Sequence, residues 1–317
     1  MLKNKRFITA VLTAVLAATG LVGCGNTTQT QSDVDDGKVS VVASFYPMSD
    51  FARKIGGDKV SVKCMVPAMQ EPHVWEPTPQ DIAQLSDADV FVYNGCGLEG
   101  WVDGVKDNLD PDKPVVVEAS KGCHLLKSDH DHGHDHDDHH HEGGYDPHVW
   151  LSPANARIGM QNICDALVKV DPDNAEYYKK NMKEASIECD RLEREYKDTL
   201  DKCDRHEIVV SHEAFGYICH DFGLEQIGIE GIEPDGEPNP ARMAEIVELT
   251  KSKGVTTIFT EAMVNPKVAH QIANETGCVV EELNPLEGLS EEDQKAGMDY
   301  FKVMRNNLEE LKVALSD

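Results

Sequence analysis

Residues 60–93 read VSVKCMVPAMQEPHVWEPTPQDIAQLSDADVFVY and contain one complete structural unit. Apolar segments at 60–66 and 88–93 predict two strands. Between them, Thr78 has the features of a helix N-cap, because proline follows it directly and an acidic residue stands three positions later. A strand, a loop, a helix and a second strand in this order indicate a parallel sheet covered by helices.

The same alternation of apolar strands and helical segments continues on both sides of this unit. The run from Asn174 to Lys202 interrupts it, since its 29 residues include neither glycine nor proline and predict one helix of about 43 Å. We interpret this helix as a rigid strut between two lobes, with a coiled-coil partner as the alternative. The remaining strands are expected at residues 39–44, 114–118, 207–211, 255–260 and 279–283, and the remaining helices at 48–55, 153–171, 213–222, 239–253, 266–276 and 291–315.

The predicted fold class is therefore α/β, with two Rossmann-like α/β lobes joined by one long rigid helix. Each lobe has enough residues for a sheet and a core of its own. The predicted organisation is a lipoprotein signal peptide at 1–23, a flexible tether at 24–37, an N-terminal α/β lobe at 38–172 with a histidine-rich loop at 124–144, a linking helix at 173–203 and a C-terminal α/β lobe at 204–317.

The first residues have the features of a secretory signal. Three positive charges precede an apolar stretch at 7–22, and Gly23 and Cys24 follow it. This pattern resembles the lipobox of bacterial lipoproteins, which implies cleavage before Cys24 and a lipid anchor on its thiol. Ordinary secretory cleavage or an uncleaved anchor is the alternative. Residues 25–37 are polar without an apolar face and predict a flexible tether.

The chain is strongly acidic. Its formal net charge is −27, and removal of residues 1–23, which carry three positive and no negative charges, changes it to about −30. Such a surface repels nucleic acid, which we do not expect as a partner, and favours the accumulation of cations. Eight cysteines remain besides Cys24 without any C-x-x-C pair, so their pairing is left open.

A second unusual stretch, residues 129–150, reads DHDHGHDHDDHHHEGGYDPHVW. Imidazoles are mostly neutral at pH 7, so alternating imidazoles and carboxylates offer many ligands for a borderline divalent cation such as zinc. An expression tag is the alternative, but a tag would lie at a terminus and would not alternate with aspartate. Because such a tract cannot form a packed core, we expect an accessory metal loop with His130, His132, His134, His136, His139, His140 and His141 as its ligands.

Three further histidines stand where ligands bind in α/β proteins. His73 lies in the loop after the second predicted strand, His148 directly before a capped helix, and His212 at the carboxyl end of a strand in the second lobe. Ligands bind at the carboxyl ends of parallel strands, so these imidazoles from both lobes could close one metal site in the cleft. Three imidazoles and one oxygen make a tetrahedral zinc shell. For the fourth position we favour Glu287, with water as the alternative.

Other polar residues near these histidines receive more modest roles. Zinc-bound imidazoles usually donate their second N–H to an acceptor, and the candidate acceptors are Glu71, Glu76 and Asp146. A histidine at a strand end can also simply bond loop carbonyls. We expect His124 to join the ligands of the accessory loop, and we expect surface or packing roles for His206, His220 and His270.

Four segments resemble the signatures of one family. EPHVWEPTPQDIAQLSDADVFVYNGCGLEGW, YDPHVWLSP, VVSHEAFGY and LNPLEGL are similar to segments of the zinc-binding solute-binding lipoproteins of bacterial ABC importers, the ZnuA/AdcA type. The resemblance covers essentially the whole mature chain, including the acidic, histidine-rich insertion. It implies a metal held between two α/β lobes tied by a long helix. The family's motif histidines carry over to His73, His148 and His212, and an acidic residue in the last loop, here Glu287, is a ligand in some members.

The resemblance also implies the biological role. The expected protein is monomeric, extracytoplasmic and anchored to the bacterial membrane through Cys24, where it captures Zn²⁺ for an ABC permease and its ATPase subunit. Manganese-binding relatives use two histidines and two carboxylates, so the histidine at position 212 points to zinc. A manganese-specific member of the same family, or a surface adhesin or zinc buffer, is the alternative.

An enzymatic role is not expected. Three histidines and an open position would also describe a catalytic zinc. However, neither His206-Glu207 nor His212-Glu213 is followed by the second histidine of an H-E-x-x-H helix, and the G-x-S-x-G elbow of hydrolases is missing. The sequence also contains no G-x-x-x-x-G-K-[ST] loop, so the chain is not the ATPase of a transporter.

Overall fold

The computed structural model describes residues 37–128, 144–232, 238–263 and 265–316. The predictions for the signal peptide, for the lipidated Cys24 and for the seven histidines from His130 to His141 lie outside these described residues. Residues from Gly37 onward form one compact unit. None of the helices described is both long and apolar enough to cross a membrane.

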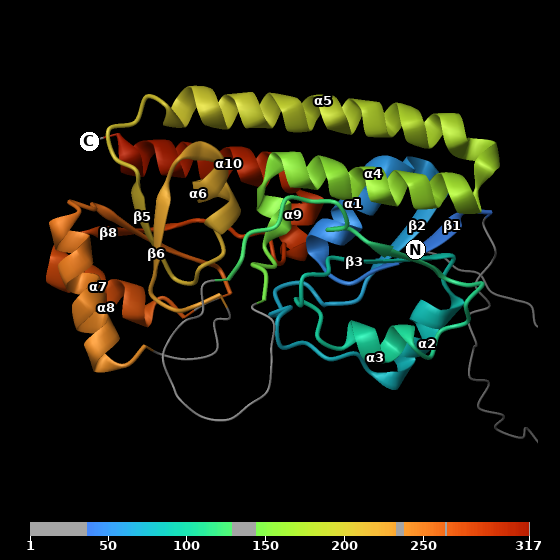
Figure 1. The fold of residues 1–317 in the computed structure, drawn as a ribbon, viewed down its shortest axis with the longest axis horizontal. Coiled ribbons are helices and arrows are strands. Elements are labelled where there is room, and N and C mark those ends of the chain that lie inside the picture. Colours follow the sequence, from blue (N-terminus) through green and yellow to red (C-terminus); the bar gives the residue numbers. More distant parts are fainter. Residues whose placement is uncertain (1–36, 129–143, 233–237, 264, 317) are drawn as a thin grey trace, which may run out of the picture. The chain divides into compact units, whose positions relative to one another are not determined.

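Two four-stranded sheets, both entirely parallel, form the framework of this unit (Figure 1). Their strand orders, β2-β1-β3-β4 and β6-β5-β7-β8, are the same when each sheet is counted from its own first strand. The prediction of two parallel α/β lobes is therefore confirmed. The strands are β1 (Val39–Ala43), β2 (Val60–Cys64), β3 (Val90–Tyr93) and β4 (Val115–Glu118), then β5 (Glu207–Val210), β6 (Glu225–Gly228), β7 (Thr257–Thr260) and β8 (Val279–Glu282).

Helices follow most strands, and local sequence sets where they begin. Thr78 and Asp81 form the reciprocal capping box that the sequence predicts for the second helix. Ser152 caps the fourth helix, accepting a hydrogen bond from Asn155 N. The α-helices are α1 (Tyr46–Gly56), α2 (Pro79–Asp87), α3 (Val102–Lys106), α4 (Pro153–Val170), α5 (Ala175–Leu200), α6 (Gly216–Phe222), α7 (Pro240–Ser252), α8 (Lys267–Thr276), α9 (Glu291–Lys295) and α10 (Tyr300–Leu315), and 3-10 turns span Gly57–Lys59, Val149–Leu151 and Pro172–Asn174.

The long helix α5 contacts helices from both halves of the chain (Figure 1). Its buried residues recur every three or four positions and form one apolar stripe. Asn181 donates to Ile55 O at the end of α1, and Tyr196 donates to Met304 O in α10. Arg305 of α10 pairs with Glu188 and Glu195 of α5. These contacts fix α5 against helices that follow the first sheet and against the last helix of the chain.

Three elements differ from the sequence-based expectation. The helix expected from residue 213 begins at Gly216, because Ala214 N–H is bonded to His212 O in a tight turn. Strand β6 was not expected, because its four residues include a single strongly apolar side chain, Ile227. The helix expected over 291–315 is divided into α9 and α10, since Gly297 adopts φ +80° and Asp299 caps a new helix.

Candidate metal centre

The four residues expected to bind metal come from four different loops. His73 lies between β2 and α2, and His148 immediately precedes the 3-10 turn before α4. His212 follows β5, and Glu287 lies between β8 and α9. Three of the loops leave the carboxyl ends of strands β2, β5 and β8, which is where parallel sheets place their ligand sites. Two residues thus come from segments around the first sheet and two from segments around the second.

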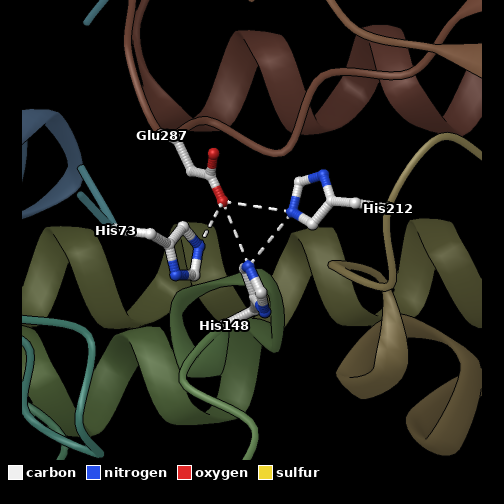
Figure 2. A group of neighbouring side chains, drawn as sticks. All are labelled: His73, His148, His212 and Glu287. Atoms are coloured by element: carbon white, nitrogen blue, oxygen red, sulfur yellow. Dashed lines mark hydrogen bonds and ion pairs between the residues drawn. The ribbon is translucent and has the colours of Figure 1, made fainter. Parts of the chain in front are cut away.

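The side chains of these four residues meet at one point (Figure 2). Glu287 Oε1 lies 3.2 Å from His73 Nε2, 3.0 Å from His148 Nε2 and 3.3 Å from His212 Nε2. The Nε2 atoms of His148 and His212 are 3.3 Å apart. All four candidate ligand atoms lie within 4.8 Å of one another. The structure therefore brings together every residue that the sequence proposed for the cleft.

These separations match a tetrahedral zinc shell. Zinc binds imidazole nitrogen and carboxylate oxygen at about 2.0–2.2 Å, so the corners of a tetrahedron around it lie about 3.3–3.5 Å apart. The four printed separations, from 3.0 to 3.3 Å, are close to this value. Glu287 Oε2 is buried and has no hydrogen-bond partner among the described residues. A buried carboxylate oxygen without a partner is costly, and a bound cation would relieve that cost.

Carboxylates orient two of the three imidazoles. His148 Nδ1 donates to Asp146 Oδ1 at 2.8 Å, and His212 Nδ1 donates to Glu261 Oε1 at 2.5 Å. With the proton held on Nδ1, the lone pair of the neutral ring is on Nε2, which points toward the centre of the site. For His73, the corresponding anchor is its backbone N–H, which donates to Glu71 Oε1 at 3.0 Å.

The electrostatics of the site favour a positive charge. Burial lowers the pKa of His148, but hydrogen bonds to Asp146 and Glu287 raise it above the ordinary value. Burial also lowers the pKa of His212, yet the charges of Glu261 and Glu287 raise it well above the usual range. The pKa of Glu287 is well below its usual range, because the nearby histidines, His212 first, outweigh the raising effect of burial. Without metal, protons on the imidazoles balance the buried carboxylates.

The loop that carries Glu287 is anchored on both sides. Trp150, two residues after His148, donates from Nε1 to Pro285 O at 2.8 Å. Asn307 of α10 accepts from Asn284 N and donates to Asn284 O. Leu286 is fully buried and adopts φ +62°, a conformation that non-glycine residues rarely occupy. The backbone is thus fixed where Glu287 enters the site.

The turn that carries His148 is held from both halves of the chain. Asn94, after β3, donates from Nδ2 to Pro147 O, and Tyr217 of α6 donates to Asp146 O. Gly216 leaves room for the Asp146 carboxylate, because a Cβ at this position would lie 2.5 Å from Asp146 Oδ2. The segment from Asp146 to His148 is therefore fitted against α6 as well as against the first sheet.

The outcomes for the other polar candidates are mixed. Asp146 and Glu71 contact the histidines as expected, whereas Glu76 is exposed and bonds neither ring. Glu261 was missed, although it directly follows β7 and the rule that places His212 at a strand end applies to it equally. His220 also differs from expectation, because its ring stacks on His124 rather than lying alone on the surface.

Comparisons with known proteins agree with this site. Residues 41–314 match the family described as "ZnuA: Zinc-uptake complex component A periplasmic". The chain is 42% identical over 306 residues to the high-affinity zinc uptake system protein ZnuA of Bacillus subtilis, which covers 95% of this chain and 96% of that protein. It is 38% identical to the zinc-binding lipoprotein AdcA of Streptococcus pneumoniae over 96% of this chain, but spans only 60% of AdcA.

Solved structures give the same result for the fold. The Zn(II)-bound ZnuA-like domain of Streptococcus pneumoniae AdcA is 35% identical with a TM-score of 0.76, covering 89% of this chain and all of that domain. The laminin-binding protein Lmb of Streptococcus agalactiae, described as bifunctional with adhesin and metal-transporting activity, is 36% identical with a TM-score of 0.78 and covers 88% of this chain. The chain therefore belongs to the ZnuA family, the periplasmic component A of zinc-uptake complexes.

Proposed function

We propose that this protein captures Zn²⁺ between its two lobes through His73, His148, His212 and Glu287 and delivers it to an ABC-type permease driven by an ATPase subunit. The observation that supports this most directly is the convergence of four ligand atoms, from four loops, at separations suited to one tetrahedral ion. Similarity to zinc-uptake and zinc-binding proteins gives the same ion.

The ligand set favours zinc over manganese. Imidazole nitrogen suits zinc, whereas oxygen ligands suit manganese, and this site offers three nitrogens and one carboxylate. Glu287 rather than water is the fourth ligand in this proposal, since its Oε1 contacts all three histidines and its side chain is fully buried. A competition measurement with both metals should show tight zinc binding that excess manganese does not displace.

The mechanism needs no chemical step. Neutral Nε2 atoms of His148 and His212 are presented to the ion because Asp146 and Glu261 hold the Nδ1 protons. Glu287 supplies the negative charge that a divalent ion requires in a buried site. When zinc binds, the imidazole protons that balance this charge leave. Docking of the loaded protein on the permease would reverse the process by moving loops of one lobe away from those of the other.

Binding experiments with single variants test the ligand assignment. Zinc affinity of the full chain should be measured by competition with a chelator for His73→Ala, His148→Ala, His212→Ala and Glu287→Gln. Each variant should lose tight binding, whereas His270→Ala, which removes an exposed histidine on α8, should not change it. Normal affinity in two or more of the four ligand variants would rule out this centre.

Localisation and the accessory loop are further parts of the proposal. The chain is extracytoplasmic, monomeric and anchored through a lipid on Cys24, so Cys24→Ala should release it from membranes of expressing cells. His130 to His141 form an accessory pool of weaker ligands. Deleting residues 129–142 should lower the number of zinc ions bound and leave one tight site. Loss of all tight binding in the deletion would make the loop the primary site.

Adhesion is a second candidate, supported by the similarity to the laminin-binding protein Lmb. Laminin binding by cells that display this protein would establish it. If adhesion is independent of transport, His148→Ala should abolish zinc uptake and leave laminin binding intact. If cells with and without the protein bind laminin equally, adhesion is excluded.

A further inference from the structure

A second pair of imidazoles lies outside the metal centre. The rings of His124 and His220 stack with centroids 5.0 Å apart and an angle of 24° between their planes. His124 follows β4 of the first sheet, and His220 lies in α6, next to the second sheet. The two rings therefore come from opposite halves of the chain, like the imidazoles of the metal centre. Neither side chain contributes to a hydrophobic core, because both residues are exposed.

His220 has the hydrogen bond that is typical of a metal-binding imidazole. Its Nδ1 donates to Asp221 Oδ1 at 3.1 Å, so the lone pair of the neutral ring is on Nε2. The same relation links His148 to Asp146 and His212 to Glu261 in the metal centre.

A single hydrogen-bond network holds both histidines in place. The second oxygen of Asp221 accepts a hydrogen bond from Ser152 Oγ at 2.6 Å, and Ser152 Oγ accepts one from Asn155 N. The Asn155 side chain in turn accepts from His124 N at 3.0 Å and donates to His124 O at 2.9 Å. The start of α4 thus fixes the backbone of His124 and, through Asp221, the ring of His220.

We propose that His124 and His220 form a second, weaker site for a borderline divalent cation such as zinc, with water in the remaining positions. Two nitrogens that share one ion at about 2.0–2.1 Å must lie within about 4 Å of each other. Stacked rings with centroids at 5.0 Å reach this by small rotations of exposed side chains. Two protein ligands bind more weakly than four, so this site fills only after the metal centre.

The site would have a use in a protein that collects cations. Both rings are accessible to solvent, unlike those of the metal centre, so exchange of the ion with solvent should be fast. The acidic tract begins at Asp129, five residues after His124 in the sequence. The inference does not depend on the proposed function, because His124 and His220 bind no residue of the metal centre in the interactions described above.

Anomalous diffraction at the zinc edge tests the site directly. Crystals of the full chain loaded with one equivalent of Zn²⁺ should be soaked in rising concentrations of ZnCl₂, with data collected on both sides of the edge. A second anomalous peak is expected about 2.1 Å from Nε2 of His124 and of His220. His124→Ala and His220→Ala should abolish this peak and leave the peak at the metal centre, and His270→Ala should preserve both.

A solution measurement excludes a crystal artefact. In nitrogen-15 spectra of the imidazoles, signals of His124 and His220 should shift together as zinc exceeds one equivalent. Asp221→Asn should weaken this second binding about 10- to 100-fold, because it loosens the hold on the Nδ1 proton. If the soaked wild type shows no peak between the rings, or a peak that needs a neighbouring molecule as ligand, an adventitious ion only, the inference fails. An empty metal centre with an occupied second site would instead overturn the proposed function.

Discussion

The two sheets have the same strand order but differ in how their faces are covered. In the first sheet, neighbouring residues that point to opposite faces, such as Val41 and Val42 in β1, belong to one continuous hydrophobic core. In the second sheet, Ile208 and Val210 of β5 join this same core, whereas Val209 between them belongs to a separate, smaller cluster. The smaller cluster lies under α7 and α8 and includes Ile246 and Ile272.

This difference divides the second lobe into two layers of unequal support. The inner layer shares the large core with α5 and α10, and the outer layer depends on ten buried residues. The loop of Glu287 is tied to the inner layer, because Leu283, Leu286 and Leu289 all join the large core. The metal centre is thus built mainly on the well-supported layer, and the outer helices can loosen without removing its ligands.

The largest expected effect comes from a matched pair of cavity variants. Leu192→Ala in α5 and Ile272→Ala in α8 remove fully buried aliphatic side chains, and each should cost about 2–5 kcal/mol locally. Leu192→Ala should lower the stability of the whole unit. Ile272→Ala should mainly increase hydrogen exchange in α7, α8, β7 and β8. Equal loss of protection in β1 and β3 for both variants would show that the two clusters unfold together.

The second prediction compares imidazoles with and without a carboxylate on Nδ1. Zinc binding worth about 10–16 kcal/mol over four ligands assigns roughly 3–4 kcal/mol, or about 100- to 1,000-fold in affinity, to one ligand. His148→Ala and His212→Ala should reach this loss, and His73→Ala should fall below it. Among the described residues, no carboxylate bonds Nδ1 of His73. Chelator competition measures the three values, and an equal or larger loss for His73→Ala would contradict the ranking.

The third prediction concerns pH. The pKa values of His148 and His212 are raised in the metal-free site, where burial lowers them but neighbouring carboxylates outweigh it. Zinc must displace these protons, so affinity should begin to fall while the pH is still above the ordinary histidine value of about 6.5. Each displaced proton changes the apparent affinity about tenfold per pH unit.

Calorimetry of zinc binding in buffers of different ionisation enthalpy should accordingly detect proton release at pH 7. Asp146→Asn removes one of the charges that raise the pKa of His148, so it should reduce the number of protons released. Release of no protons at pH 7 would mean that the imidazoles are already neutral and that the carboxylates do not control them.

The smallest effect is expected at the contact between α1 and α10. Partial burial raises the pKa of Asp299, but hydrogen bonds to Lys54 Nζ and Lys302 N lower it below its ordinary value. This lowered pKa contributes stability above the ordinary aspartate pKa, and the contribution is lost as the pH falls through the lowered value. Asp299→Ala should destabilise the unit by about 1 kcal/mol at pH 7, mainly through loss of the α10 cap.

Denaturant unfolding of Asp299→Ala and Lys54→Met separates the cap from the ion pair. Lys54→Met keeps the cap and should cost less, about 0–1 kcal/mol, because the pair is partly solvent-exposed. At pH 3 the difference between Asp299→Ala and the wild type should shrink. A constant difference from pH 7 to pH 3 would show that the charge of Asp299 has no part in it.

Local patterns in the sequence determined much of this protein. Apolar runs of four to six residues became strands, and Thr78 and Ser152 fixed the starts of two helices. These features could be read because burial periodicity and capping depend on residues within a few positions of one another. The four candidate ligands were also visible, since each stands in a loop beside a predicted strand or helix.

The tertiary structure decided which of these residues touch. Glu261 lies 49 positions from His212, and His124 lies 96 positions from His220, so no local pattern pairs them. The division of the second lobe into two layers also follows from which helices cover which face of β5 and β7. Parallel strands bring distant loops to one edge of a sheet, and the partners found there depend on strand order and helix packing, which sequence spacing alone does not specify.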